Sequence, residues 1–593
     1  MDSVLGPPAS GWEGGERIAS RDSHVARGGD ARRARRHLLL PALRAVQSRA
    51  GWISPGALNY VCERLDVAPA DAYGVASFYA LLSVERQPAT IVHVCEDLAC
   101  RLAGASRLAE RLAGTWPRGT VRPAPCLGQC ERAPAALVQK SGPDAAEYAV
   151  APASLPLSPA PEGPAAAPRS GSPSAPQTLD SRRDALRLLR RVGRIDPESL
   201  EDYRAHGGYR ALTKAIERTP AGVVREALAS RLQGRGGAAF PAGRKWEAVA
   251  KAPERPHYLV CNADESEPGT FKDRVLLEED PFAIVEAMTI VGFATGCETG
   301  FLYVRGEYPL AFARFSRAVA SAREAGLLGE RVLGAAIRFD IEVRRGAGAY
   351  ICGEETALFN SIEGFRGEPR NKPPFPVEKG LFGKPTVVNN VETLACVPDL
   401  VLDGGEAFAR IGTAQSTGPK LFCLSGAVAR PGVYEVAFGA TLRELLALAG
   451  GVPSGRSLRA VLLGGAAGTF LAPSELDVPL TFEGTRAIGA SLGSGVVMAF
   501  DDRADLADAV ARIAAFFRDE SCGQCVPCRV GTERQEELVA RLAAGRPLAS
   551  RETELTLLDE MAQAMRDASI CGLGQTASGA IQSAIRKLGV FPA

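Results

Sequence analysis

The segment Glu520-Ser-Cys-Gly-Gln-Cys-Val-Pro-Cys-Arg-Val-Gly-Thr532 decides how the C-terminal part of this chain folds. Its cysteines are separated by two residues each, so one turn of backbone can direct several thiolates at one metal site. Gly523 and Pro527 keep the segment out of a regular helix, and Cys571 is the only cysteine further along the chain. Four thiolates suit a [4Fe–4S] cluster or structural zinc. The Cys-x2-Cys-x2-Cys spacing with a remote fourth cysteine favours iron and sulfur.

A second group of four cysteines lies nearer the N-terminus. Residues 91–94 predict a short buried strand before the first pair, and another strand-to-turn segment precedes the second pair. The four residues are Cys95, Cys100, Cys126 and Cys130. Thiolates from two loops can hold a [2Fe–2S] cluster, two on each iron. Zinc remains an alternative, and disulfides would need an oxidising compartment.

Length and composition indicate a globular protein of several domains. The 593 residues are too many for one core and predict three to five domains. A net charge of +1 does not indicate a nucleic-acid or membrane-surface partner. No apolar run approaches the ~20 residues of a spanning helix, so direct membrane insertion is not expected. The scattered remaining cysteines are typical of buried free thiols, and we expect a reducing cytoplasm.

Composition changes along the chain predict the domain boundaries. Residues 36–82 have helical apolar spacing, with Ser54-Pro55 as cap and first turn, and Leu186, Leu188, Leu189 and Val192 are also spaced helically. Short strand-like runs at residues 421–424, 433–436, 461–463 and 496–500 alternate with glycines, and residues 442–448 predict a short helix. The predicted domains are a disordered tail at 1–35, a helical bundle with a [2Fe–2S] domain at 36–150, a Pro/Ala/Ser linker at 151–178, a nucleotide-binding domain at 179–415, a small α+β domain at 416–504, and a helical bundle at 505–593.

Four segments rich in glycine and polar residues indicate a nucleotide site. The first places Gly234, Gly236 and Gly237 around Arg235, with Lys245 beyond. Glycines let backbone N–H groups approach a phosphate, although a lone glycine cluster is as often a simple turn. The spacing is neither Gly-x-Gly-x-x-Gly nor a Walker loop, so a standard dinucleotide fold is not predicted.

The other three segments strengthen this interpretation. An acidic loop follows a buried strand and runs from Asn262 to Glu267, where carboxylates suit sugar hydroxyls or the polar edge of a cofactor. Residues 345–358 combine glycines, a tyrosine and two carboxylates, and Asn389-Asn390 with Thr393 form the last cluster. Four such clusters are hard to explain as solvated turns, and we interpret them as one composite pocket.

These motifs resemble a known family. Residues 180–593 resemble the NADH-binding flavoprotein subunit of respiratory complex I and its relatives. The resemblance is carried by Gly-Arg-Gly-Gly-Ala-Ala-Phe-Pro, Asn-Ala-Asp-Glu-Ser-Glu-Pro-Gly-Thr, Gly-Ala-Gly-Ala-Tyr-Ile-Cys-Gly-Glu-Glu-Thr and Glu-Ser-Cys-Gly-Gln-Cys-Val-Pro-Cys-Arg. Residues 36–150 resemble that complex's thioredoxin-like [2Fe–2S] subunit. The resemblance implies an α/β multidomain fold: a thioredoxin-like domain, a Rossmann-like FMN/NAD domain, a ubiquitin-like (SLBB-type) domain and a C-terminal helical bundle.

The resemblance also implies the site residues and cofactors. FMN would lie on Gly234, Arg235, Gly236, Gly237, Lys245, Asn262, Asp264, Glu265, Ser266, Gly353, Glu354, Val388, Asn389, Asn390 and Thr393. NAD(H) would stack over the flavin near Phe240, Glu267, Tyr350, Glu355 and Phe375. A [4Fe–4S] cluster would use Cys522, Cys525, Cys528 and Cys571, and a [2Fe–2S] cluster the N-terminal set. Ala239 departs from the family, which usually has glycine there.

The same resemblance implies a function. A hydride would pass between NAD(H) and FMN, and single electrons would then pass through the [4Fe–4S] cluster. No side-chain nucleophile or base would be required. Fusions of this kind are typical of the β subunit of NAD-dependent molybdenum or tungsten formate dehydrogenases and of diaphorase subunits of NAD-reducing hydrogenases. Residues 565–575 resemble the former, which implies an α-type Mo/W partner and the reaction of formate and NAD+ to CO2 and NADH. Hydrogenase subunits as partners, or an NADH:quinone oxidoreductase flavoprotein, are the alternatives.

Overall fold

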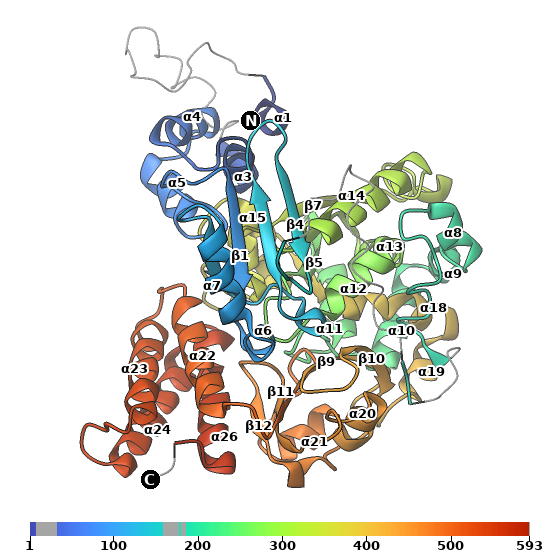
Figure 1. Cartoon of the computed structure of the whole chain (residues 1–593). Coiled ribbons are helices and arrows are strands. Elements are labelled where there is room, and N and C mark those ends of the chain that lie inside the picture. Colours follow the sequence, from blue (N-terminus) through green and yellow to red (C-terminus); the bar gives the residue numbers. More distant parts are fainter. Residues whose placement is uncertain (8–32, 158–176, 180–184, 592–593) are drawn as a thin grey trace.

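The computed structural model describes residues 1–7, 33–157, 177–179 and 185–591. An N-terminal unit, a parallel-sheet domain, a small β-rich domain and a C-terminal helical bundle pack against one another (Figure 1). Most of the predicted tail and linker, residues 8–32 and 158–176, lies outside the described residues. Within the described part of the chain, no helix is long and apolar enough to cross a membrane.

The N-terminal unit begins with helices and continues into a four-stranded sheet. Ser54 caps α4 as predicted, since its side chain accepts a hydrogen bond from the N–H of Ala57. The sheet has the order β2-β1-β3-β4, in which only β1 and β2 run parallel. This is the predicted thioredoxin-like arrangement. Its elements are η2 (Arg36–Leu38), α3 (Leu39–Ala50), α4 (Pro55–Leu65), α5 (Pro69–Ala76), β1 (Thr90–Cys95), α6 (Leu98–Leu102), α7 (Ala105–Thr115), β2 (Val121–Ala124), η3 (Cys130–Arg132), β3 (Ala136–Lys140) and β4 (Ala146–Val150).

The first residues of the chain correct part of the disorder prediction. Asp2–Leu5 form a short helix, α1, and Leu5 is buried in the core. Arg64 pairs with the Asp2 carboxylate at 3.2 Å and donates to the carbonyl of Gly6 at 2.6 Å. The burial of Leu5 and the polar contacts of Arg64 therefore order residues 1–7. Composition alone does not reveal this order.

The parallel-sheet domain carries the four glycine-rich and polar segments. Its sheet has the order β7-β6-β5-β8, and all its strands run parallel. In the register of β5 and β8, Asn262 lies beside Asn390, so two of the predicted clusters meet at the carboxyl edge of the sheet. The strands are β5 (His257–Ala263), β6 (Cys297–Val304), β7 (Asp340–Arg345) and β8 (Thr386–Asn390).

Helices surround this sheet and bury it. The almost wholly buried α13 packs on β5 and β6. The helices are α8 (Leu200–Ala205), α9 (Arg210–Arg218), α10 (Pro220–Ser230), α11 (Ala242–Lys251), α12 (Lys272–Glu279), α13 (Pro281–Thr295), α14 (Pro309–Glu324), η5 (Val332–Gly334), η6 (Tyr350–Gly353), α15 (Glu355–Glu363), α16 (Pro376–Lys379), η7 (Leu381–Gly383), α17 (Val391–Ala395), α18 (Val397–Asp403) and α19 (Gly405–Ala409).

The small domain and the bundle complete the chain. The small domain has the sheet order β10-β9-β13-β11-β12, with β9 and β13 parallel at its centre, and a core of its own. Its elements are β9 (Pro419–Gly426), β10 (Gly432–Ala437), α20 (Leu442–Leu448), β11 (Leu458–Leu463), β12 (Thr469–Leu471), η8 (Pro473–Glu475), α21 (Phe482–Ala487) and β13 (Val496–Asp501). The bundle consists of α22 (Leu506–Asp519), α23 (Val526–Ala543), α24 (Arg551–Ala568), α25 (Gly572–Thr576) and α26 (Gly579–Leu588).

The N-terminal unit contacts both the parallel-sheet domain and the bundle. Arg512 of α22 donates to the buried Asp97 at 2.7 Å, and Arg101 of α6 makes a two-point contact with Asp508 of α22 at 2.6 and 2.8 Å. In Figure 1 the bundle (red) accordingly lies next to α6 of the N-terminal unit (blue). These charged contacts fix the positions of the two cysteine sets relative to each other.

Candidate functional site

The glycine-rich loop lies against the end of β8. The N–H of Arg235 donates to Thr393 Oγ1 at 2.8 Å. A Cβ at Gly236 would stand 3.2 Å from the Cβ of Asn390, and Gly237 has a φ of +117°. Side chains at these positions would disturb the close approach, so the loop presents bare backbone towards the carboxyl edge of the sheet.

Hydrogen bonds and ion pairs bring the other predicted segments to the same edge. Lys245 Nζ lies 3.3 Å from Glu355 Oε2 and 3.5 Å from the carbonyl of Val388. The amide of Asn262 donates to the carbonyl of Gly353 at 2.9 Å. The structure therefore brings together all four segments that were interpreted as one pocket. Their positions are the loop before α11 (Gly234, Arg235, Gly236, Gly237, Phe240), α11 itself (Lys245), β5 and its following loop (Asn262, Asp264, Glu265, Ser266, Glu267), η6 and the start of α15 (Tyr350, Gly353, Glu354, Glu355), the N-cap of α16 (Phe375), and β8 with α17 (Val388, Asn389, Asn390, Thr393).

Several predicted ligands use their side chains to hold the loops themselves. Glu265, at a φ of +36°, accepts hydrogen bonds from the N–H groups of Asp273 and Arg274 and from the hydroxyl of Tyr308. Glu354 caps α15 by accepting from the N–H groups of Thr356 and Ala357. These carboxylates have the geometry of loop anchors, which keep the backbone of the site in place.

Two further carboxylates and two aromatic rings lie at the same edge. Burial raises the pKa of Asp264 to about 8, and its carboxylate accepts from the Ser266 hydroxyl at 2.7 Å. At Glu355 burial raises the pKa, but Lys245 and Lys372 outweigh burial, so the pKa lies below its ordinary value and the group stays charged. Phe240 and Phe375 are 50% and 52% exposed, so their rings are free to pack against the planar rings of a bound molecule.

A buried charge network under the site was missed by the sequence interpretation. Lys272 and Lys420 both pair with Glu392, at 3.0 and 2.8 Å, and none of the three side chains is exposed. Lys272 also donates to Asn390 at 3.2 Å, so the network supports the strand end that carries the predicted site. In the sequence these residues look like ordinary surface charges, and no motif marks them.

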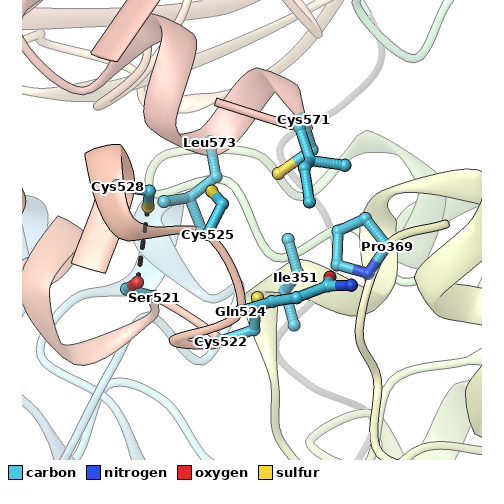
Figure 2. A pocket seen from close by; sticks show the side chains of 10 residues that line it. Ile351, Pro369, Ser521, Cys522, Gln524, Cys525, Cys528, Cys571 and Leu573 are labelled. Atoms are coloured by element: carbon cyan, nitrogen blue, oxygen red, sulfur yellow. Dashed lines mark hydrogen bonds between the residues drawn. The ribbon is translucent and has the colours of Figure 1, made fainter. Parts of the chain in front are cut away.

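The four C-terminal cysteines surround a pocket. The pocket is lined by Cys522, Cys525, Cys528 and Cys571 together with Ile351, Pro369 and Leu573 (Figure 2). Four thiols that border one cavity suit a multi-iron cluster, which takes four thiolate ligands.

The N-terminal cysteines lie at the base of their sheet, facing the parallel-sheet domain. Cys95 ends β1, Cys100 lies in α6, and Cys126 and Cys130 follow β2, with 3.4 Å between the last two sulfurs. All four are buried. Hydrogen bonds among these sulfurs lower the pKa of the Cys126 thiol and raise the pKa of the Cys95 and Cys130 thiols. Arg305 of the parallel-sheet domain donates to the carbonyls of Cys126 at 2.6 Å and Glu265 at 2.9 Å, linking this loop to the acidic loop.

Comparison with known proteins agrees with this geometry. Four family models match: the Nuo51 FMN-binding domain at residues 228–399, the iron-sulfur binding region of NADH-ubiquinone oxidoreductase F at 508–589, the thioredoxin-like [2Fe-2S] ferredoxin at 28–149, and the SLBB domain at 421–466. The F 2 component of the NADH-quinone oxidoreductase of Rhizobium meliloti is 46% identical over 401 residues, which cover 67% of this chain and 94% of that protein. The chain belongs to this family of F-type flavoproteins.

Other members and a solved structure extend the likeness. The HndC component of the NADP-reducing hydrogenase of Solidesulfovibrio fructosivorans is 45% identical over 399 residues, covering 66% of this chain and 80% of its own. A chain of an NAD+-reducing [NiFe]-hydrogenase in the H2-reduced state has a TM-score of 0.79 at 32% identity and covers 95% of this chain and 94% of its own. This F-type flavoprotein is thus an NAD(H)-dependent oxidoreductase module with FMN, a [4Fe–4S] cluster and a [2Fe–2S] cluster.

The residues present fit these cofactors. Bare backbone beside a lysine suits a phosphate, exposed rings suit stacked planar rings, and two sets of four thiols suit two clusters. The described part of the F-type chain therefore has a place for each cofactor that its family binds.

Proposed function

We propose that the chain is the NAD(H)-handling β subunit of a molybdenum- or tungsten-dependent formate dehydrogenase, which couples formate oxidation to NAD+ reduction. The observation that carries this choice is the segment of residues 565–575, Met-Arg-Asp-Ala-Ser-Ile-Cys-Gly-Leu-Gly-Gln, which resembles that subfamily around the cluster ligand Cys571. The fused N-terminal [2Fe–2S] domain is typical of both formate dehydrogenase and hydrogenase subunits, so the choice rests on the segment around Cys571. The chain carries no molybdenum-site motif of its own, so a partner subunit would oxidise formate.

The chain's own residues would bind and orient the reactants. FMN, when bound, supplies the hydride exchange with NAD(H). The glycine loop and Lys245 would hold the phosphate, and the buried network of Lys272, Glu392 and Lys420 would keep the strand end beneath it rigid. Asp264, whose pKa burial raises to about 8, is protonated at pH 7 and would donate a hydrogen bond from its carboxyl group.

Residues around the rings would position the nicotinamide nucleotide. The exposed Phe240 and Phe375 would cover its rings and exclude water. Glu355 stays charged beside Lys245 and Lys372 and would accept hydrogen bonds from ribose hydroxyls. Tyr350 is fixed at both ends, since its N–H donates to Glu520 and its hydroxyl to Glu267. It thereby joins the nucleotide side of the site to the segment that carries Cys522.

A second candidate is the diaphorase subunit of an NAD-reducing hydrogenase. It is favoured by the whole-length likeness to the hydrogenase chain, which includes the N-terminal unit. The two candidates share the NAD(H) chemistry and differ in the partner that exchanges electrons with this chain.

Purification of the native complex separates the candidates. We expect molybdenum or tungsten in the co-purified assembly, and NAD+ reduction that depends on formate and continues without H2. Nickel together with H2-dependent NAD+ reduction and no response to formate would replace the proposal with the second candidate. NADH oxidation with an artificial acceptor serves as the control, because either complex performs it.

A further inference from the structure

An arginine outside both predicted ligand sets lies against the C-terminal cysteine loop. Arg366 follows α15, and its Nη2 donates to the main-chain carbonyl of Cys522 at 3.4 Å. Cys522 lines the pocket between the four cysteines. The Arg366 side chain is 46% exposed, so it can change without opening a cavity in the core.

The N-terminal unit holds this arginine in place. The Arg366 guanidinium carbon lies 5.2 Å from the centre of the Phe78 ring, which follows α5 on the other side of the predicted linker. The neighbouring Tyr79 donates to the carbonyl of Phe365 at 3.3 Å. A Cβ at Gly367 would meet Cys352 Sγ at 2.5 Å and Phe78 at 3.2 Å. The turn that carries Arg366 is therefore fixed by close packing, and its guanidinium is aimed at the cysteine loop.

One carboxylate opposes this positive charge. Glu368 Oε1 lies 3.0 Å from Arg366 Nε, and its own N–H donates to the carbonyl of Arg366 at 2.7 Å. A second pocket, of about 250 Å³, opens here between the N-terminal unit and the cysteine segment and is lined by Phe78, Arg366, Glu520 and Cys522. The cation donates directly to the cysteine segment, whereas the charge of Glu368 acts on Cys522 in the opposite sense, raising the pKa of its thiol where Arg366 lowers it.

We propose that Arg366, held against Cys522 by Phe78 of the N-terminal unit, is a positioning residue that raises the reduction potential of the [4Fe–4S] cluster. Reduction adds one electron and makes the cluster more negative, with no bond formed or broken. A nearby positive charge and its hydrogen bond stabilise this more negative state, and cluster potentials follow such charges. The fused N-terminal unit would thus tune the cluster of the C-terminal bundle. The inference rests on the cluster site and is independent of which partner subunit the chain has.

The test is a redox titration of the purified holoprotein, followed by the electron paramagnetic resonance signal of the reduced [4Fe–4S] cluster. We expect Arg366→Gln to shift the midpoint potential to a more negative value and Arg366→Lys to shift it less, because lysine keeps the charge. Phe78→Leu should shift it in the same direction as Arg366→Gln. Glu368→Gln should shift it to a more positive value. Flavin content and the [2Fe–2S] signal should stay as in the wild type.

Defined outcomes overturn the inference. An unchanged midpoint in Arg366→Gln, or a shift in Arg366→Lys as large as that in Arg366→Gln, would show that the charge has no such role. If Arg366→Gln fails to incorporate the cluster, the Glu368→Gln variant provides the test instead. A midpoint potential in Glu368→Gln that is unchanged or more negative would then contradict the proposal. An unchanged Phe78→Leu midpoint would remove the role of the N-terminal unit. The redox titrations do not depend on the formate assay of the proposed function, so they remain valid if that assay fails.

Discussion

Ala239 takes a backbone conformation that usually belongs to glycine. Its φ is +54°, in the left-handed region, at the position where the family usually has glycine. An alanine there is disfavoured by ~1 kcal/mol, whereas glycine gains a similar amount of freedom in the unfolded chain. The loop thus keeps the glycine-like conformation despite the methyl group, and this departure from the family motif leaves its shape intact.

We expect Ala239→Gly to change the free energy of unfolding by less than about 1 kcal/mol and to leave flavin binding unchanged, because the two effects nearly cancel. Chemical unfolding and flavin absorbance per chain measure both quantities. The control is Ala248→Gly in α11, an exposed position in the helix interior where glycine costs about 1 kcal/mol. A loss of flavin in Ala239→Gly would show that the methyl group itself contributes to the site.

At Lys245 the prediction concerns binding. Lys245→Ala should lower the flavin content of the purified protein, because this ammonium group lies beside the glycine loop, where it contacts Glu355, the carbonyl of Val388 and the Phe240 ring. Lys251→Ala, on the same helix but paired with Glu247 at the surface, is the control. Unchanged flavin absorbance per chain in the Lys245 variant would contradict the assigned role.

Among the elements, β10 carries a carboxylate that organises a distant turn. Glu435 is 3% exposed and accepts hydrogen bonds from the N–H groups of Arg187, Leu188 and Leu189. Burial raises its pKa to about 7. In the unfolded chain this carboxyl has its usual pKa of about 4.5. Between about pH 4.5 and 7 the folded state therefore holds a proton on Glu435 that the unfolded state has lost. The stability from this group is therefore fully present below the unfolded pKa and is lost as the pH rises through 7.

The wild type should accordingly lose stability relative to Glu435→Gln as the pH rises from 5 to 8, by up to about 3 kcal/mol. Thermal midpoints of both proteins at the two pH values provide the comparison. Glu406→Gln, which removes an exposed carboxylate, should follow the wild type. Parallel pH profiles for wild type and Glu435→Gln would refute the assignment of a raised pKa.

In the cysteine loop before α23, we expect Cys525→Ser to leave flavin binding intact and to stop electron transfer to the partner subunit, because one ligand of the cluster is lost. Iron analysis and NADH-driven reduction of the partner measure the effect. Cys396→Ala, a buried cysteine outside both ligand sets, is the matched control. Full-rate reduction of the partner by the Cys525 variant would exclude this cluster from the electron path.

Local patterns predicted most elements, and the exceptions have long-range causes. The strands around residues 421–424, 433–436, 461–463 and 496–500 and the helix at 442–448 agree with the structure, because alternation and helical spacing are local signals. The short edge strand β12 was not predicted. Residues 186–192 have helical spacing but form turns, since their N–H groups donate to Glu435 more than 200 residues away.

Residue chemistry decided how much of the candidate site could be predicted. Cysteine spacing and glycine–acid loops are specific signals, so both thiol sets and all four loops were identified before their contacts were known. Lys272, Glu392 and Lys420 were missed because burial of a charge leaves no trace in a sequence. The prediction of a disordered tail was wrong at residues 1–7 for a similar reason, since the order of these residues depends on contacts with a distant partner, Arg64.

At the scale of the whole molecule, contacts spread over several domains hold the N-terminal unit against the rest of the chain. Besides the pairs of Arg101 and Arg512, Arg44 donates to the carbonyl of Gly346 at 2.8 Å and Tyr79 to the hydroxyl of Ser361 at 2.8 Å. Buried and charged contacts of this kind persist when a covalent connection is cut.

A protease site inserted between residues 158 and 176 should therefore yield two polypeptides that co-elute in size-exclusion chromatography and keep both clusters. Arg512→Met should weaken this association, because it leaves the buried Asp97 without its partner. The surface variant Arg338→Met is the control, as its ion pairs are exposed. Separate elution of the two cleaved polypeptides of the wild type would show that the covalent connection itself maintains the assembly.

The unequal burial of the two thiol sets suggests an order of maturation. Cys95, Cys100, Cys126 and Cys130 are all buried, and Arg305 of the parallel-sheet domain donates to the carbonyl of Cys126, whereas Cys522, Cys525 and Cys571 stay partly open to solvent. We expect iron and sulfide to reach the first set before the N-terminal unit packs against the rest of the chain, while the second set can be loaded or repaired in the finished fold. We therefore expect a cell that makes this chain as one polypeptide to deliver metal to its N-terminal half early.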